Sequence, residues 1–343
     1  MRCVRLHAPR DLRLESAPDP KPGPRQALVR VHSVGICGSD LHYYEEGRIG
    51  SNKMTVPFVL GHEFAGTIEG VGEGIDPARI GQRVAVEPGT PCFVCEHCTR
   101  GEYNVCPKMA FPGGPGHDGA LCDFMAVPAE FCFPVPESMG HDEAAAIEPL
   151  AVALHSVELA GMRPGDTVAV LGTGPIGLLI AMAARVSGAV TIYGADLLPY
   201  RVAAAAACGV DHACDASKED TVEAIFRATG GRGVDVAFDA ARSSETAALA
   251  CRVARPGGTC VLTGISGAVE DPIPVEVARR KGLTVRWCRR FRHNYPRAIA
   301  LVSAGLIDVK KIVSHSFPLE RTPEAFALVS RAGDRVLKAS IDF

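Results

Sequence analysis

The sequence predicts a two-domain α/β protein in which a β-rich half is followed by alternating strands and helices. The chain has 343 residues, which exceeds the usual size of a single hydrophobic core. Residues 1–150 combine many glycines and prolines with short strand patterns such as "ALVRVHSVGIC" and "RVAVEP". From about residue 150, strand and helix patterns alternate, as in "TVAVLG", "LLIAMAARVSGA" and "TIYGAD". This alternation is typical of βαβ units with a parallel sheet.

The composition is that of an ordinary globular protein and disfavours several classes of partner. The net charge of −3 and the hydrophobic fraction of 47% give no electrostatic footprint for nucleic acid or anionic membranes. No apolar stretch is long enough for a spanning helix, and the N-terminus lacks the apolar region of a signal peptide. The thirteen cysteines are therefore expected to be reduced, and the protein to be cytoplasmic.

Four cysteines lie close together in the segment "GTPCFVCEHCTRGEYNVC". Separations of two, two and seven residues let four thiolates surround one tetrahedral ion, as in a closed structural zinc site. The alternative is a loop of four thiols without metal. We expect a structural zinc on Cys92, Cys95, Cys98 and Cys106.

A glycine motif follows an apolar strand in "VAVLGTGPIGLLIAMAA". Gly172 would permit a tight turn, Gly174 would let the backbone approach a pyrophosphate, and Gly177 would allow close packing of helix on strand. Asp196 ends the next strand, where an acidic residue receives the adenosine ribose hydroxyls and repels a 2′-phosphate. The motif predicts NAD as cofactor, with a cofactor site made by Gly172, Gly174, Pro175, Ile176, Gly177, Asp196 and Arg201.

The segment "GHEFAG" places His62 and Glu63 in apolar surroundings. Taken alone, this pair is either an exposed turn or part of a metal site.

The chain resembles the zinc-dependent medium-chain dehydrogenase/reductase family, and most closely its sorbitol and xylitol dehydrogenase branch. The resemblance rests on "GICGSDLHYYEEGRIG", "VLGHEFAG", the four-cysteine lobe, "IEPLAVALH", "GTGPIG" and "FPLE", which together span nearly the whole chain. It implies a GroES-like catalytic domain formed by residues 1–152 and 290–343, with the zinc lobe at about 89–108. A Rossmann domain would then cover residues 153–289, and the closing strand "VLKASIDF" would return to the catalytic domain.

The resemblance also implies a catalytic zinc, the second zinc of the chain. Its ligands would be Cys37, His62 and Glu148, with Glu63 binding directly or through water. Thiolate, imidazole and carboxylate leave one position open for water or a substrate hydroxyl. Glu148 replaces a cysteine of related alcohol dehydrogenases and points to the polyol branch; it could instead cap the helix that follows.

Other site residues follow from the same resemblance. Ser39 and His42 match proton-relay positions, although either could cap a turn, and Asp40 is expected to accept a hydrogen bond from His62. A substrate pocket would include Tyr43, Phe111, Arg290 and Phe291. Phe291 stands where sorbitol dehydrogenases commonly have tyrosine, although an alignment with a gap makes Arg292 the equivalent residue.

The expected reaction is the oxidation of a secondary hydroxyl of a polyol, with hydride passing to NAD. Arg286, Arg289, Arg290 and Arg292 could either hold a carboxylate or lie on a solvated surface strand and loop, so a sugar acid such as L-idonate is the second candidate. A cofactor-binding protein without activity is a third, disfavoured because the whole predicted ligand set is present. The family also implies a homo-oligomer, either a tetramer or a dimer.

Overall fold

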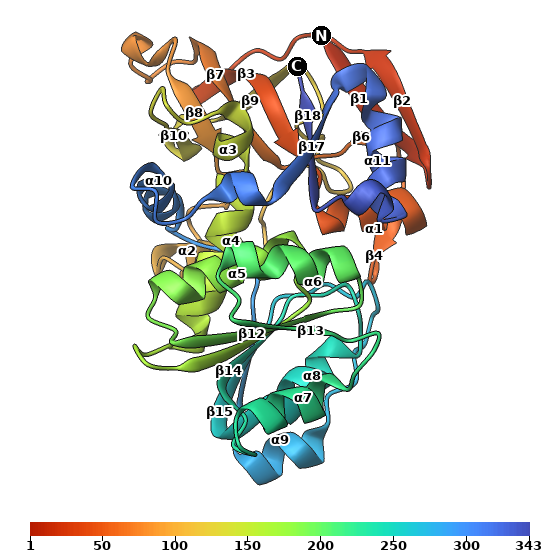
Figure 1. The fold of residues 1–343 in the computed structure, drawn as a ribbon. Helices are drawn as coiled ribbons and strands as arrows, with labels where there is room; N and C mark the ends of the chain where they lie inside the picture. The colour runs from red at the N-terminus through yellow and green to blue at the C-terminus, as the bar shows by residue number, and fades with distance from the viewer. The chain divides into compact units, whose positions relative to one another are not determined.

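The computed structural model describes residues 1–343, which form two compact units. The first unit contains Met1–Glu148, Tyr295–Gly305 and Val313–Phe343, and the second contains Pro149–Asn294 and Leu306–Ile312 (Figure 1). The division differs in detail from the expected one, because residues 149–152, 290–294 and 306–312 belong to the second unit. None of the helices in the structure is both long enough and apolar enough to span a bilayer.

The first unit is built on a seven-stranded sheet with the order β10-β8-β7-β3-β18-β17, and β9 also pairs with β3. Buried and partly exposed residues alternate along much of β3, the pattern of a strand with one face on the core. The strands are β3 (Gln26–Gly35), β7 (Glu63–Val71), β8 (Arg83–Val86), β9 (Phe124–Pro128), β10 (Cys132–Pro134), β17 (Val313–Pro318) and β18 (Lys338–Asp342).

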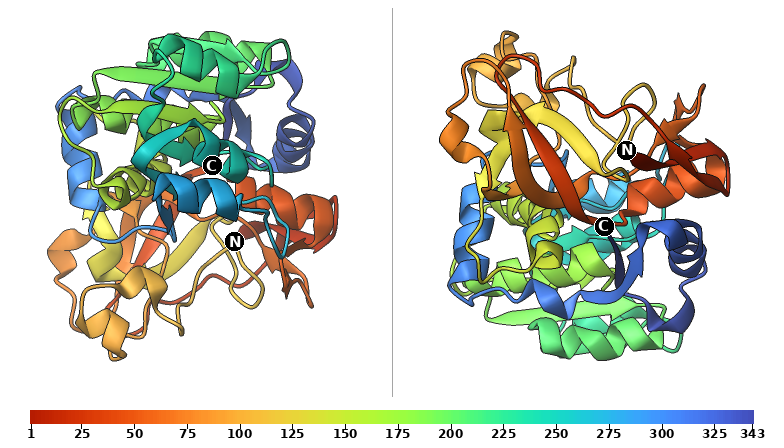
Figure 2. Two further views of the ribbon diagram at one scale, coloured as in Figure 1. Left: turned by 90° about the horizontal axis from the view of Figure 1, so that it is seen from below. Right: turned by 90° about the horizontal axis from the view of Figure 1, so that it is seen from above.

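The end of the chain completes this sheet. Strand β18 runs antiparallel to β3, with Ser340 opposite Gly35 and Ile341 opposite Val34. Figure 2 shows the dark blue β18 next to the red β3, although these strands lie at opposite ends of the sequence. The pairing places Lys338 within the sheet that carries Glu63.

Two smaller sheets and several helices complete the first unit. The small sheets are β2-β1-β6 and β4-β5, with β1 (Arg2–Ala8), β2 (Asp11–Ser16), β4 (Arg48–Ile49), β5 (Asn52–Lys53) and β6 (Phe58–Val59). The helices are α1 (Gly38–Glu46), α2 (Glu96–Thr99), α3 (His141–Ala145), α10 (Tyr295–Ser303) and α11 (Thr322–Ser330). Helix α4 (Ile147–Ala160) begins in the first unit and continues in the second.

The second unit is a six-stranded parallel sheet with the order β13-β12-β11-β14-β15-β16. In chain order this is 3-2-1-4-5-6, the Rossmann arrangement. Its central strands are almost continuously buried, as expected when helices cover both faces, and Figure 1 shows α5 and α6 on one face and α7 and α8 on the other. The strands are β11 (Thr167–Leu171), β12 (Thr191–Asp196), β13 (His212–Asp215), β14 (Val234–Asp239), β15 (Ala254–Leu262) and β16 (Thr284–Trp287). The helices are α5 (Pro175–Val186), α6 (Pro199–Ala205), α7 (Thr221–Ala228), α8 (Thr246–Val253) and α9 (Val275–Lys281). The predicted α/β class is confirmed.

Candidate metal centres and cofactor site

Cys37, His62 and Glu63 come together in the first unit. One ligand atom from each lies within 4.8 Å of the others, and His62 and Glu63 are buried. Cys37 precedes α1, and His62 immediately precedes β7, whose first residue is Glu63. Ring atom Nδ1 of His62 is buried without a hydrogen-bond partner. A thiolate, an imidazole and a carboxylate that converge in this way form a donor set suited to a divalent zinc ion.

The backbone around this group is fixed by Asp40, which is 1% exposed. One of its carboxylate oxygens accepts a hydrogen bond from the Cys37 amide at 3.0 Å, and the other accepts one from the Gly61 amide at 3.2 Å. Its Oδ1 lies 3.6 Å from Nδ1 of His62, longer than a direct hydrogen bond. Burial lowers the pKa of His62, but the charges of Asp40 and Cys37 raise it, and the net result lies well above the usual pKa.

A lysine that the sequence analysis did not identify belongs to the same group. Lys338 is 4% exposed, its Nζ contacts a carboxylate oxygen of Glu63, and it donates to the carbonyl of Ile36 at 3.2 Å. Gly35 leaves room for this contact, since a Cβ there would lie 2.3 Å from the Glu63 oxygen. The only available signal was a lysine at the start of the closing strand, where Ala339 and Ile341 indicate burial.

Glu148 lies near this group but is not among the residues whose ligand atoms lie within 4.8 Å of one another. It stands in the first turn of α4 and is 5% exposed. Burial raises its pKa to about 8, and the charges of Glu63 and Asp40 also raise it, whereas those of His62 and Lys338 lower it. The structure therefore groups Glu63, rather than Glu148, with Cys37 and His62.

Of the other predicted residues of the first unit, one contacts His62 and three lie on α1, the helix that follows Cys37. The ring of Phe111 is 5.1 Å from that of His62. Helix α1 carries Ser39, His42 and Tyr43; His42 is 2% exposed, with Nδ1 3.8 Å from Glu46. The Tyr43 hydroxyl accepts a hydrogen bond from Asn52. Arg290 and Phe291 belong to the second unit, where Arg290 has a φ of 54° and Phe291 is buried.

The four cysteines of the lobe converge as a second group. The sulfur atoms of Cys95 and Cys98 are 3.4 Å apart, those of Cys95 and Cys106 are 3.9 Å apart, and those of Cys92 and Cys98 are 4.0 Å apart. Four sulfurs bound tetrahedrally to zinc at about 2.3 Å would be separated by about 3.8 Å. Backbone amides of Val94 and Cys95 lower the pKa of Cys92 to about 6 and so favour its thiolate. This donor set fits a structural zinc.

A buried carboxyl beside the lobe provides a pH test. Glu87 is 3% exposed, and burial raises its pKa to about 7, although a hydrogen bond with Tyr103 lowers it. An acid with a raised pKa in the folded state costs stability as the pH rises from about 4.5 to about 7. We expect Glu87→Gln to increase the free energy of unfolding by about 2–3 kcal/mol at pH 8 and to change it little at pH 4.5. Urea denaturation at the two pH values measures this change. An equal effect at both pH values would contradict a raised pKa for Glu87.

The glycine motif of the second unit has the expected backbone. Gly172 has a φ of 95°, and a Cβ on Gly177 would lie 1.8 Å from the Gly172 carbonyl oxygen, so only glycine fits there. Gly174 precedes α5, which begins with Pro175 and Ile176. Asp196 accepts hydrogen bonds from the amides of Thr173 and Leu198 at 2.9 and 3.0 Å. Arg201 lies 3.8 Å from the same carboxylate.

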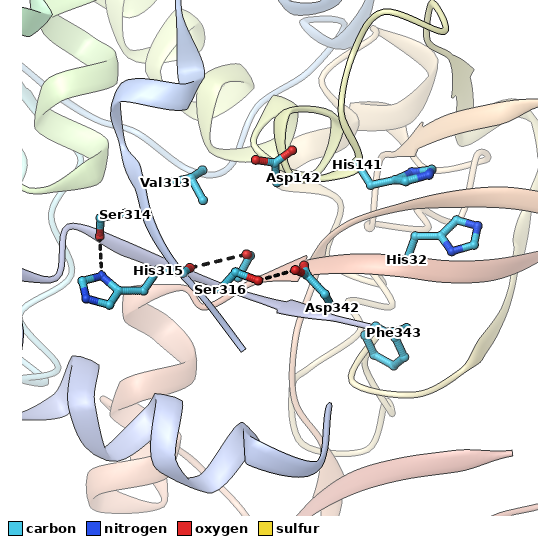
Figure 3. A pocket seen from close by; sticks show the side chains of 10 residues that line it. His32, His141, Asp142, Val313, Ser314, His315, Ser316, Asp342 and Phe343 are labelled. Carbon is cyan, nitrogen blue, oxygen red and sulfur yellow. Dashed lines mark hydrogen bonds between the residues drawn. The ribbon is translucent and has the colours of Figure 1, made fainter. Parts of the chain in front are cut away.

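The hollow shown in Figure 3 lies elsewhere in the first unit and contains none of the predicted site residues. It measures about 450 Å³ and lies between α3, β17 and the end of the chain. His32 and His141 line it with ring centroids 4.4 Å apart. Burial and the neighbouring His32 and Arg83 lower the pKa of His141 to about 4, so its ring is neutral at pH 7.

Comparisons with known proteins agree with these two units. Residues 23–137 match the alcohol dehydrogenase GroES-like domain, and residues 175–304 match the zinc-binding dehydrogenase family. Sorbitol dehydrogenase from Bacillus subtilis is 37% identical over 99% of this chain and 97% of its own length. Human sorbitol dehydrogenase is 38% identical over 94% of this chain and 90% of its own length.

Solved structures agree as well. The crystal structure of L-idonate 5-dehydrogenase from Escherichia coli superposes with a TM-score of 0.88 at 28% identity, and covers 100% of this chain and 98% of that one. Two domain matches and full-length relatives above 30% identity show the family, and the expected resemblance is confirmed. The chain is an oxidoreductase of the zinc-dependent medium-chain dehydrogenase/reductase family and belongs to its polyol dehydrogenase branch.

Proposed function

We propose that this enzyme oxidises a secondary hydroxyl of sorbitol, xylitol or a similar polyol to the ketone, with NAD as hydride acceptor. The observation that carries the proposal is the convergence of Cys37, His62 and Glu63 beside a second buried carboxyl, Glu148. The family resemblance implies that Glu148 stands where related alcohol dehydrogenases have a cysteine. The activity of the sorbitol dehydrogenases from Bacillus subtilis and human supports a polyol as substrate.

In this proposal Cys37, His62 and Glu63 hold the catalytic zinc, and Glu148 serves as a nearby carboxylate ligand or water-binding group. Bound zinc supplies a Lewis acid that lowers the pKa of the substrate hydroxyl, and bound NAD supplies the hydride acceptor. Lys338 holds the Glu63 carboxylate in place, and Asp40 fixes the backbone on both sides of the site.

Substrate binding and proton removal are assigned to residues around this centre. Phe111 lies beside His62 and would form an aromatic wall with Tyr43. Arg290 and Phe291, which belong to the second unit, are the other two residues proposed to bind substrate. Ser39 and His42 on α1 are the proposed proton relay, with the substrate proton leaving through the hydroxyl and then the imidazole.

The zinc stoichiometry is proposed to be two per chain, with the second ion on Cys92, Cys95, Cys98 and Cys106. Four thiolates would fill all four positions of that ion, so it would stabilise the lobe and would not bind substrate.

The preference for NAD is assigned to Asp196. Its carboxylate lies at the end of β12 and would repel a 2′-phosphate. We expect Asp196→Asn, which keeps an acceptor oxygen for one of the two backbone amides of Thr173 and Leu198 but not for both, to raise the ratio of kcat/KM with NADP to that with NAD by roughly tenfold to a hundredfold. Initial rates with both cofactors measure this. An unchanged ratio would show that Asp196 does not determine the preference for NAD over NADP.

A sugar acid is the second candidate substrate, because the L-idonate 5-dehydrogenase structure is similar over the whole chain. Initial rates with xylitol, sorbitol, ribitol, galactitol and L-idonate distinguish the two candidates. Oxidation of polyols in preference to L-idonate supports the proposal. Oxidation of L-idonate alone would instead identify the basic residues near Arg290 as a carboxylate clamp.

We also propose a homo-oligomer, either a dimer or a tetramer. Strand β16 is an edge of the parallel sheet, and its Trp287 is 66% exposed. An uncovered edge strand with a large exposed aromatic side chain is a natural site for a second copy of the chain. Light scattering tests the assembly.

A further inference from the structure

Two buried cysteines of the first unit are paired across an isolated β-bridge. Cys3 in β1 forms an antiparallel bridge with Cys122. The hydrogen bonds on either side run from the Val4 amide to the Leu121 carbonyl at 2.8 Å and from the Asp123 amide to the Arg2 carbonyl at 3.1 Å. The two cysteines therefore occupy a non-hydrogen-bonded position of an antiparallel pair.

This position has the spacing that a disulfide requires. At such a site the Cα atoms are about 4.5 Å apart and the two side chains extend on the same face. A disulfide joins residues whose Cα atoms are about 4.4–6.8 Å apart. The backbone pairing therefore places the two Cα atoms within the range that a disulfide can join without a change in fold.

Neither cysteine has a role in the metal sites described above. Both lie outside the two groups of residues that could hold a metal, and both side chains are buried, with exposures of 1% and 2%. The Cys122 thiol has only weak partners, the carbonyls of Gly119 and Phe124 at 3.4 and 3.2 Å. Cys132, which is equally buried, stands opposite Val86 and has no cysteine across the strand.

We propose that Cys3 and Cys122 form a reversible disulfide site that closes by exchange with a low-molecular-weight disulfide such as oxidised glutathione. The Cys3 thiol loses its proton to solvent and its sulfur attacks the small disulfide, which releases one small thiol and leaves a mixed disulfide. The Cys122 thiol then loses its proton and attacks the Cys3 sulfur, which releases the second small thiol. Two protein thiols are thus oxidised while one small disulfide is reduced to two thiols.

The surroundings decide which thiol reacts first and how fast. Burial raises the pKa of both thiols, that of Cys122 to about 12, whereas Arg5 partly offsets the effect at Cys3. Thiolates are the reacting species, so exchange begins at Cys3 and is slow at neutral pH. The bridge is a single pair outside any named strand pairing, so its brief separation gives the small disulfide access.

Formation of this disulfide would stabilise the segment that hydrogen-bonds the chain just before His62. The segment that contains Cys122 also bonds to the chain just before His62, with the Gly119 amide on the Val59 carbonyl at 2.7 Å and the Ala120 amide on the Gly61 carbonyl at 2.8 Å. Linking Cys3 to Cys122 joins β1 covalently to this support. Local opening of both segments should then become rarer.

The test uses the full-length, zinc-loaded protein treated at pH 8.5 with either oxidised glutathione or a reducing agent. Free thiols are blocked with N-ethylmaleimide, and peptides are mapped by mass spectrometry without reduction. We expect a Cys3–Cys122 crosslink in the wild type and in the matched control Cys132→Ser, and none in Cys3→Ser or Cys122→Ser. Amide hydrogen exchange of residues 2–8 and 119–123 should slow about tenfold or more on oxidation, in the wild type only.

Two outcomes would overturn the proposal. One is recovery of Cys3 and Cys122 as blocked free thiols or as separate glutathione adducts after prolonged oxidation of the wild type. The other is a crosslink that leaves hydrogen exchange of these segments unchanged, since that would place the disulfide in unfolded chains. The mapping needs only the wild type, so a variant that fails to fold does not affect it. Neither outcome bears on polyol oxidation.

Discussion

Replacing His62 by alanine is expected to lower kcat with a polyol by roughly a thousandfold or more, because a Lewis-acid metal supplies several kcal/mol of transition-state stabilisation. His62 is the buried imidazole of the Cys37–His62–Glu63 group, and no other histidine belongs to that group. NAD binding should persist, because the glycine motif lies in the second unit. Steady-state kinetics together with titration of NAD measure both effects.

The matched control is His32→Ala. His32 is a half-buried histidine of the same unit that hydrogen-bonds Thr67 and lines the separate hollow of Figure 3. This variant should retain activity within a few-fold of the wild type. Equal losses in the two variants would mean that the His62 effect reflects general destabilisation of the unit.

Replacing Lys338 by methionine is expected to destabilise the metal-free first unit by about 3–5 kcal/mol, the usual cost of leaving a buried charge without its partner. Glu63 and Lys338 are 1% and 4% exposed, so water cannot take over the lost contact. The only tryptophan, Trp287, lies in the second unit and does not report on this change. The change in stability is measured instead by urea-dependent hydrogen exchange of peptides from β3, β7 and β18.

Two further variants separate charge from packing. Lys338→Arg keeps the positive charge and should recover most of the stability. The double variant Lys338→Met with Glu63→Gln removes both charges and should be more stable than Lys338→Met alone, as a double-mutant cycle would show. If Lys338→Met unfolds at the same urea concentration as the wild type, the contact with Glu63 contributes nothing.

Much of the second unit was predictable because its signals are local. The alternation of "TVAVLG" with "LLIAMAARVSGA" reports buried strands and a covering helix within a few residues of one another. The positive φ of Gly172 and the contact between Gly177 and Gly172 are likewise set within one turn. The convergence of the four lobe cysteines follows from their spacing over fifteen positions, from Cys92 to Cys106.

The details of the first unit depend on contacts between distant parts of the chain, which local patterns do not report. Lys338 reaches Glu63 only because β18 pairs with β3, itself the partner of β7. The relative placement of Glu63 and Glu148 depends on where α4 begins against the sheet. The return of residues 306–312 to the second unit has no counterpart in composition or hydrophobic periodicity.

The most direct test of the proposed catalytic centre is zinc content per chain, measured together with NADH formation from xylitol and sorbitol, in the wild type, Cys37→Ser and Cys98→Ser. We predict two zinc ions in the wild type and one in each variant. Activity should be lost in Cys37→Ser. Cys98→Ser should lose the zinc of the lobe but keep the active-site zinc, and with it the ability to oxidise polyols. A Cys37→Ser protein that keeps both zinc ions and oxidises polyols at the wild-type rate would contradict the assignment of Cys37, His62 and Glu63 as the catalytic zinc site.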